Sequence, residues 1–169
     1  MKQQIIISGL GGQGALTVTR VLAEAAAALG LEVITSETHS MAQRGGAVIS
    51  MVKVGPFRGP LIHPGQGDVG LFLHAKNLGV HRSYLKEDAA VFVNTGAAGD
   101  YQAVNARALA GRMGAAVAAN LILLGFAAAR RGLFCGPDIL EQVIRDKTPA
   151  RFRDMNLQAV RAGAAAAAG

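Results

Sequence analysis

Apolar and polar positions in the first part of the chain predict a strand, a helix and a second strand. Residues 3–8 form a near-continuous apolar run, which is typical of a strand buried on both faces. Residues 12–29 follow a helical period, and Gly30 provides a C-terminal stop. Residues 31–36 predict a second short strand. This strand–helix–strand unit, with its right-handed crossover, favours an α/β sheet. The residues expected on the inward side of the helix are Leu16, Val18, Val21, Leu22 and Ala25.

The rest of the chain predicts three more strands with longer and less regular connections. Strands are expected at 47–54, 68–74 and 89–94, with a helical segment over 75–85. Residues 55–67 contain three prolines and four glycines and predict an irregular surface segment, and residues 95–104 predict a loop. Helices are expected at 105–130, with a break near 111–114, at 138–145 and at 151–167.

The connection between the second and third predicted strands, residues 37–46, is polar and ends in glycine. It lacks a helical pattern, whereas parallel neighbours need a connection of a dozen or more residues that is usually helical. The third strand is therefore not expected to follow a simple parallel crossover. Because neither an internal repeat nor a linker is visible, we expect one domain over residues 1–169.

The glycine cluster Gly9-Leu10-Gly11-Gly12-Gln13-Gly14 lies between the first strand and the first helix. Backbone N–H groups and the positive end of the helix dipole converge at such a turn, so it can bind an anionic group. The spacing also fits the dinucleotide fingerprint G-x-G-x-x-G, and Glu37, twenty-three residues after Gly14, is close to the expected ribose-binding acid. The alternative is that these glycines simply permit a close strand-to-helix turn.

Arg44, Gly45 and Gly46 form a second candidate for anion binding. An arginine fork beside two glycines lets guanidinium and backbone approach one carboxylate or phosphate together. The alternative is a glycine bend before a strand. His39 lies nearby, but no serine or cysteine is placed beside it as a nucleophile, so we predict no catalytic residue.

The other reactive side chains indicate no metal site. His63, His74 and His81 lack metal-ligand spacing with an acidic or cysteine partner. The single cysteine, Cys135, excludes an internal disulfide and a four-cysteine cluster. A helix dipole could lower the pKa of its thiol, but a small buried hydrophobe is the favoured interpretation.

Composition and charge narrow the class of protein. The formal net charge is +6, yet the basic residues are scattered and the chain has two Tyr and no Trp, which disfavours nucleic-acid binding. The apolar fraction of 51% can form a sizeable core. No apolar run reaches the length of about 18 residues that spans a bilayer, and residues 1–4 lack a signal-peptide pattern, so we expect a cytoplasmic protein without membrane contact.

Two stretches together resemble a known family. The glycine cluster, followed by Ser36-Glu37-Thr38-His39-Ser40-Met41-Ala42-Gln43-Arg44-Gly45-Gly46-Ala47-Val48, is similar to the gamma subunit of 2-oxoacid:ferredoxin oxidoreductases. Residues 41–46 look most like the beta subunit of the indolepyruvate type. The similarity continues through Pro60-Leu61-Ile62, Gly67-Asp68-Val69, Tyr84-Leu85, Val93-Asn94-Thr95 and Asn120-Leu121-Ile122-Leu123-Leu124-Gly125, and so covers nearly the whole chain. Two places differ from the family pattern: residues 74–79, where two acids are expected, and Ser40, where a glycine is usual.

The resemblance implies a single Rossmann-like α/β three-layer sandwich of the pyruvate:ferredoxin oxidoreductase domain III type. It also implies a gamma-type subunit of an enzyme that oxidatively decarboxylates a 2-oxo acid such as indolepyruvate or pyruvate. Thiamine diphosphate and iron–sulfur clusters are then bound by partner subunits, coenzyme A takes the acyl group and ferredoxin takes the electrons. The chain alone is expected to bind no cofactor, to be inactive, and to be able to form a homodimer.

Within this interpretation, we expect the turn at residues 9–14 and the loop at residues 37–46 to share one sheet edge that faces the catalytic subunit. Gly9, Gly11, Gly12, Gln13 and Gly14, together with Glu37, Arg44, Gly45 and Gly46, are the predicted contacts to coenzyme A phosphates or to a subunit carboxylate. The alternatives are a free-standing dinucleotide-binding protein and a purely structural interaction subunit.

Overall fold

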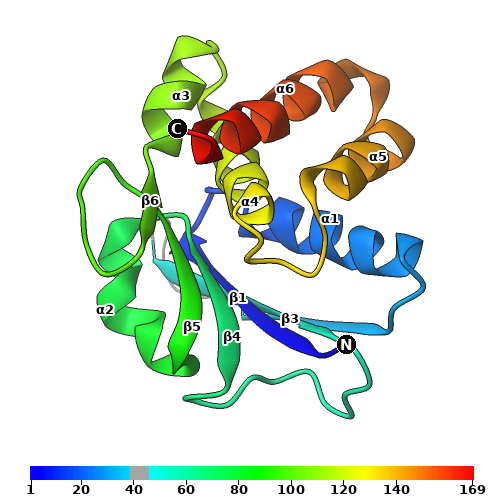
Figure 1. Ribbon diagram of the computed structural model, residues 1–169, viewed down its shortest axis with the longest axis vertical. Coiled ribbons are helices and arrows are strands. Elements are labelled where there is room, and N and C mark those ends of the chain that lie inside the picture. The colour runs from blue at the N-terminus through cyan, green and yellow to red at the C-terminus, as the bar shows by residue number, and fades with distance from the viewer. Residues whose placement is uncertain (39–45) are drawn as a thin grey trace.

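The computed structural model describes residues 1–38 and 46–169, which fold around a mixed β-sheet (Figure 1). In these residues six strands pair in the order β2-β3-β1-β4-β5-β6. The neighbours β1, β4, β5 and β6 are parallel, and β3 lies antiparallel between β1 and β2. The strands are β1 Gln3–Leu10, β2 Val33–Thr38, β3 Ala47–Val54, β4 Gly67–Phe72, β5 Leu85–Asn94 and β6 Gln102–Val104.

The position of β3 confirms that the second and third strands are not joined by a parallel crossover. β1 and β2 run in the same direction on either side of β3, so the first strand–helix–strand unit is not a pair of neighbouring strands. The predicted bounds of β3 are confirmed. β1 continues two residues beyond the predicted end because Gly9 and Leu10 still pair with Val48 and Ala47.

Helices α1 Ala15–Ala28, α4 Ala119–Ala129 and α5 Pro137–Lys147 cover one side of the sheet, and α6 Ala150–Ala167 packs outside them (Figure 1). Residues 120–128 of α4 are all buried, as expected for a helix that is apolar all round. A Cβ at Gly163 of α6 would collide with the carbonyl oxygen of Ile122, so α6 crosses α4 at very short range.

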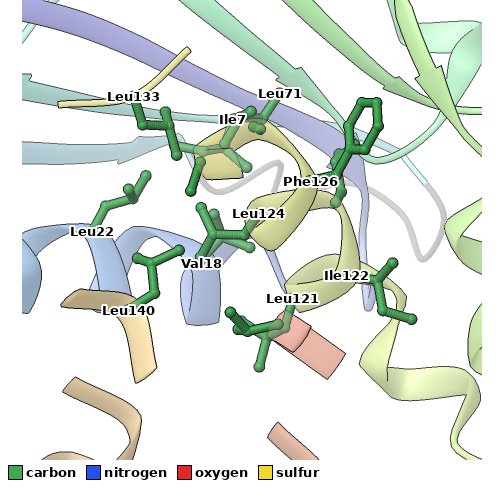
Figure 2. Close-up of a cluster of buried hydrophobic side chains, with 14 of the residues drawn as sticks. Ile7, Val18, Leu22, Leu71, Leu121, Ile122, Leu124, Phe126, Leu133 and Leu140 are labelled. Atoms are coloured by element: carbon green, nitrogen blue, oxygen red, sulfur yellow. The ribbon is translucent and has the colours of Figure 1, made fainter. Parts of the chain in front are cut away.

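The main core lies between these helices and the sheet. Figure 2 shows Val18 and Leu22 of α1 and Leu124 of α4 pointing toward Ile7 and Leu71 of the central strands. All five side chains are at most 1% exposed. Burial of this kind stabilises a fold by roughly 1.5–3 kcal/mol for each large aliphatic side chain. The core therefore anchors both β1 and α1, the two elements that flank the glycine turn.

The opposite side of the sheet has a thinner cover. Short helical pieces, η1 Ala75–Asn77, α2 Leu78–His81 and η2 Arg82–Tyr84, pack over a second apolar cluster that includes Ile6 and Phe72. The helical segment expected over 75–85 is confirmed, as three successive short helices that end at Tyr84. With helical segments on both faces, the domain is a three-layer α/β sandwich of Rossmann-like type, as predicted.

The C-terminal half departs from the sequence prediction in one further element. Residues 95–104 are not all loop, since β6 pairs with the end of β5. Its three residues are too short to produce a recognisable alternation. The predicted break near 111–114 is confirmed: α3 Ala106–Arg112 ends before Gly114, and η3 Ala116–Ala118 leads into α4. Among the helices of residues 1–38 and 46–169, none has the length and apolarity to cross a bilayer.

Candidate binding site

A pocket of about 770 Å³ lies where the parallel strands end. One wall is formed by Gly12, Gln13 and Gly14. These belong to residues 9–14, which we call the glycine turn. The other walls follow β4 and β5 and include the start of α4. We call this the carboxyl-edge pocket. It lies where the chain leaves β1 toward one side of the sheet and β4 toward the other, the position at which open α/β sheets bind ligands.

The backbone of the glycine turn explains why glycine is needed there. Gly12 and Gly14 have φ of +89° and +84°, in the left-handed region that side chains with a Cβ rarely adopt. Gly9 has another reason, since a Cβ would lie 3.0 Å from both Gln13 Oε1 and Leu73 Cβ. The predicted sequence of strand, tight turn and helix N-terminus is confirmed.

Three N–H groups of the glycine turn are bound within the protein. The N–H of Leu10 donates to Gln13 Oε1 at 2.7 Å, that of Gly11 to the carbonyl of Gly46 at 3.0 Å, and that of Gln13 to the carbonyl of Leu10 at 3.1 Å. The first amides of α1, residues 15–17, have no acceptor within their own helix. Donors for a ligand are therefore concentrated at the start of α1 rather than spread over the turn.

Side-chain amides from distant elements fix the walls of the pocket. Asn120 of α4 donates from Nδ2 to the carbonyl of Gly14 at 3.1 Å. Gln13 and Asn94 both donate to the carbonyl of Leu73, at 3.3 and 3.2 Å. Asn94 also accepts the N–H of Arg107 at 3.2 Å. Sequence reasoning named Gln13 but missed Asn94 and Asn120, although an asparagine directly after an apolar strand, as at Asn94, is a usable signal.

The lining of the carboxyl-edge pocket suits an anion. None of its residues in the described chain is acidic, and it includes His74 and Arg107. The guanidinium of Arg107 makes no ion pair or hydrogen bond to any residue within 1–38 or 46–169. The positive end of the α1 dipole adds to this arrangement.

The structure brings some of the predicted site residues together and separates others. Gly46 lies against the glycine turn through its bond to Gly11. Glu37 pairs with Ser50, which in turn pairs with Ile7 of β1. Two strand spacings place it about 10 Å from β1, and it does not line the pocket. Residues 39–45, among them Arg44 and Gly45, lie outside the described residues.

A buried polar cluster that sequence reasoning missed lies beneath the end of β1. Ser8 Oγ and His81 Nδ1 are 2.6 Å apart, and Asn77 contacts Ser8 as well. Burial lowers the pKa of His81. The Ser8 side chain has no exposed surface, so this pair is not arranged to attack a dissolved substrate. Seventy-three residues separate Ser8 from His81, and no local pattern predicts their contact.

Cys135 is a packing residue. It is 6% exposed, and desolvation together with the charge of Asp138 raises the pKa of its thiol to about 12. The idea of a helix dipole that lowers this pKa is therefore wrong. The described residues also contain no group of three or more His, Cys, Asp or Glu side chains that could hold a metal ion.

Comparisons with known proteins match the chain from end to end. A model of the pyruvate ferredoxin/flavodoxin oxidoreductase family matches residues 4–166. Indolepyruvate oxidoreductase subunit IorB of Archaeoglobus fulgidus is 32% identical, over 96% of this chain and 94% of the relative. The IorB subunit of Methanothermobacter thermautotrophicus is 30% identical, over 99% of both chains. In the solved structure of the keto/oxoacid ferredoxin oxidoreductase gamma subunit from Geobacter sulfurreducens PCA, 26% of residues are identical, the TM-score is 0.78 and 98% of both chains is covered.

Proposed function

The chain belongs to the pyruvate ferredoxin/flavodoxin oxidoreductase family, and we propose that it is a subunit of an indolepyruvate-type 2-oxoacid:ferredoxin oxidoreductase. In the proposed reaction a 2-oxo acid loses carbon dioxide, coenzyme A receives the acyl group and ferredoxin receives two electrons. The observation that carries the proposal is the match to IorB subunits over nearly the full length of both chains. The proposal includes a cytoplasmic location.

In this proposal partner subunits bind thiamine diphosphate and the iron–sulfur clusters. A four-iron cluster needs about four thiolates, and this chain has one cysteine, which is buried. Thiamine diphosphate supplies the carbanion chemistry of decarboxylation when bound to its own subunit. This chain contributes a shaped surface to the complex rather than the reacting groups.

The carboxyl-edge pocket is the surface that we propose to face the catalytic subunit. Among the residues that the structure describes, its lining has no acidic side chain and the guanidinium of Arg107 has no partner. This lining supports binding of a phosphate of coenzyme A or a carboxylate of the partner. The predicted role of Arg44 at the same edge stays part of the proposal. The volume of the carboxyl-edge pocket, about 770 Å³, lies within the range of small-molecule sites.

Co-expression with the thiamine-dependent subunit tests the proposal. A stable complex that reduces ferredoxin with indolepyruvate and coenzyme A is the expected result, and the failure of any such subunit to co-purify would refute it. Arg107→Gln should raise the KM for coenzyme A at least tenfold, because a charge-assisted hydrogen bond contributes about 1.5–3 kcal/mol. Arg112→Gln is the matched control, since Arg112 is exposed on the same helix and does not line the pocket.

The two anionic ligands give different results in this experiment. If Arg107 binds coenzyme A, the complex of the Arg107→Gln variant assembles normally and its KM for coenzyme A rises. If Arg107 binds a carboxylate of the partner, assembly weakens and the KM is unchanged. Equal behaviour of the two variants would remove the pocket from the proposal. The same pair of measurements on Arg44→Ala tests the residue outside the described chain.

A free-standing dinucleotide-binding protein is the second candidate, favoured by the left-handed glycines at positions 12 and 14. Calorimetry of the isolated chain with NAD distinguishes it, because a dinucleotide site binds without a partner subunit. A purely structural interaction subunit, the third candidate, would capture the thiamine-dependent subunit without any effect of Arg107→Gln on coenzyme A.

A further inference from the structure

We infer that Asn77 is a positioning residue of the carboxyl-edge pocket: it fixes the point at which β1 departs into the glycine turn, and Ser8 and His81 orient it. The positioning role of Asn77 rests on its hydrogen bonds and on those of Ser8 and His81. Its consequence for coenzyme A rests on the proposed function.

The three side chains form one connected network under the sheet edge. They are 2%, 0% and 9% exposed for Asn77, Ser8 and His81. Asn77 Nδ2 donates to Ser8 Oγ at 3.0 Å and to the carbonyl of Gly9 at 2.6 Å. Ser8 Oγ lies 2.6 Å from His81 Nδ1. The network joins the segment after β4 to the last residues of β1.

The number of donors and acceptors assigns a donor and an acceptor to each hydrogen bond of the network. The amide nitrogen of Asn77 is a donor, so Ser8 Oγ accepts from it. Within residues 1–38 and 46–169 the hydroxyl of Ser8 has no acceptor other than His81 Nδ1, so the arrangement that satisfies this buried donor has Ser8 donating to an unprotonated Nδ1. His81 is therefore neutral with its proton on Nε2, in agreement with its burial. Each bond orients the next, and the amide of Asn77 cannot rotate without breaking two of them.

Gly9 is the place where this orientation acts. The ladder between β1 and β4 ends with the N–H of Leu73 donating to the carbonyl of Ser8 at 2.7 Å. The carbonyl of Gly9 points to the other side of β1, where Gly9 pairs with Val48 of β3, and Asn77 donates an additional hydrogen bond to it. Beyond Gly9 the chain enters the turn whose residues 12–14 line the pocket. Asn77 thus ties the segment after β4 to the end of β1, just before the chain enters the pocket wall.

Hydrogen exchange of the full chain, measured by NMR, tests this without a partner subunit. Asn77→Asp keeps the shape of the side chain but removes both N–H donors. The amide of Gly11, which donates to Gly46, should exchange at least tenfold faster than in a control variant of equal global stability. Val54→Ala is that control, because Val54 is fully buried and pairs with Gln3 at the other end of β1.

Unchanged protection of Gly11 in Asn77→Asp, relative to Val54→Ala, would overturn the inference. If Asn77→Asp does not fold, Ser8→Ala removes only the orienting hydroxyl and should give a smaller acceleration at the same amide. The ¹⁵N spectrum of His81 is a second readout, and a protonated Nδ1 would contradict the direction of the network.

Kinetics of the complex separate this inference from the proposed function. A positioned turn predicts that Asn77→Asp raises the KM for coenzyme A severalfold with kcat changed less than twofold. Faster exchange at Gly11 with an unchanged KM supports the positioning role and counts against coenzyme A at this pocket. Unchanged exchange overturns the positioning role, whatever the KM.

Discussion

Replacement of Gly14 by alanine perturbs the glycine turn through backbone strain and through a steric conflict. Gly12→Ala introduces the strain without the conflict and so separates the two. Both residues have left-handed backbone, with φ of +84° and +89°. A Cβ at Gly12 would meet no heavy atom of residues 1–38 or 46–169 within 4 Å, whereas a Cβ at Gly14 would collide with Nδ2 of Asn120. The Gly12 variant therefore measures backbone strain alone, and the Gly14 variant adds a steric conflict inside the pocket wall.

The magnitudes follow from these contacts. A left-handed conformation costs a residue with a Cβ about 1–2 kcal/mol, which is the expected loss for Gly12→Ala. In Gly14→Ala the displaced Asn120 also gives up its hydrogen bond to the carbonyl of Gly14, about 1 kcal/mol, and shifts its packing, about 1–3 kcal/mol. We expect the free energy of unfolding of Gly14→Ala to fall by about 3 kcal/mol or more. The thermal midpoint should fall by about 2–4 °C for each kcal/mol lost.

Urea unfolding of the single variants, of Asn120→Ala and of the Gly14→Ala/Asn120→Ala double variant measures both contributions. Because Asn120→Ala removes the colliding amide, the two substitutions should be less than additive, with a coupling of about 1–2 kcal/mol. Equal losses for Gly12→Ala and Gly14→Ala, or full additivity with Asn120→Ala, would refute the steric argument.

Two further predictions concern buried titratable groups. Because burial lowers the pKa of His81 in the folded chain, the unfolded chain binds the extra proton, and stability should fall as pH decreases below about 6.5. In urea titrations His81→Asn, which keeps an acceptor for Ser8, should show a flatter pH dependence, and an equally steep one would contradict this assignment. The thiol of Cys135, with its pKa raised to about 12, should resist a disulfide reagent in the native protein and react with one equivalent after unfolding. Rapid native labelling at pH 8 would show that the side chain is accessible.

Short-range patterns in the sequence predict most of the elements, because each of them depends on a local period. The apolar run in β1 and the helical period of α1 needed no knowledge of their neighbours, and Val18, Leu22 and Ala25 are fully buried as expected. Leu16 was expected to face inward but is 37% exposed. The buried positions of α1 follow the series Ala15, Val18 and Leu22, and Leu16, one residue after Ala15, lies about 100° away from that face.

The network under the glycine turn could not be predicted because its members meet only through the sheet. Ser8 and His81 come together when β4 pairs with β1 and the chain returns over the opposite face. A lone serine at a strand end and a histidine in a short helical segment carry no signal of that contact. The same holds for Asn120, which reaches the turn from 106 residues away. By contrast, the glycines of the turn require special backbone angles, and that requirement is visible in the sequence itself.

The insertion of β3 changes what the glycine turn can recognise. In the dinucleotide fold the strand beside β1 is parallel to it and ends in the acid that binds the ribose. Here that place belongs to β3, which runs the other way and presents its amino end at the pocket edge. The backbone carbonyl of Gly46 therefore lies beside Gly11, where a ribose-binding carboxylate would be needed, and Glu37 is one strand further out. A turn of this kind retains the donors at the start of α1 that suit a phosphate or carboxylate. It lacks the neighbouring acid that suits a nucleoside, so an anionic group of coenzyme A or of a partner subunit fits this edge better than NAD.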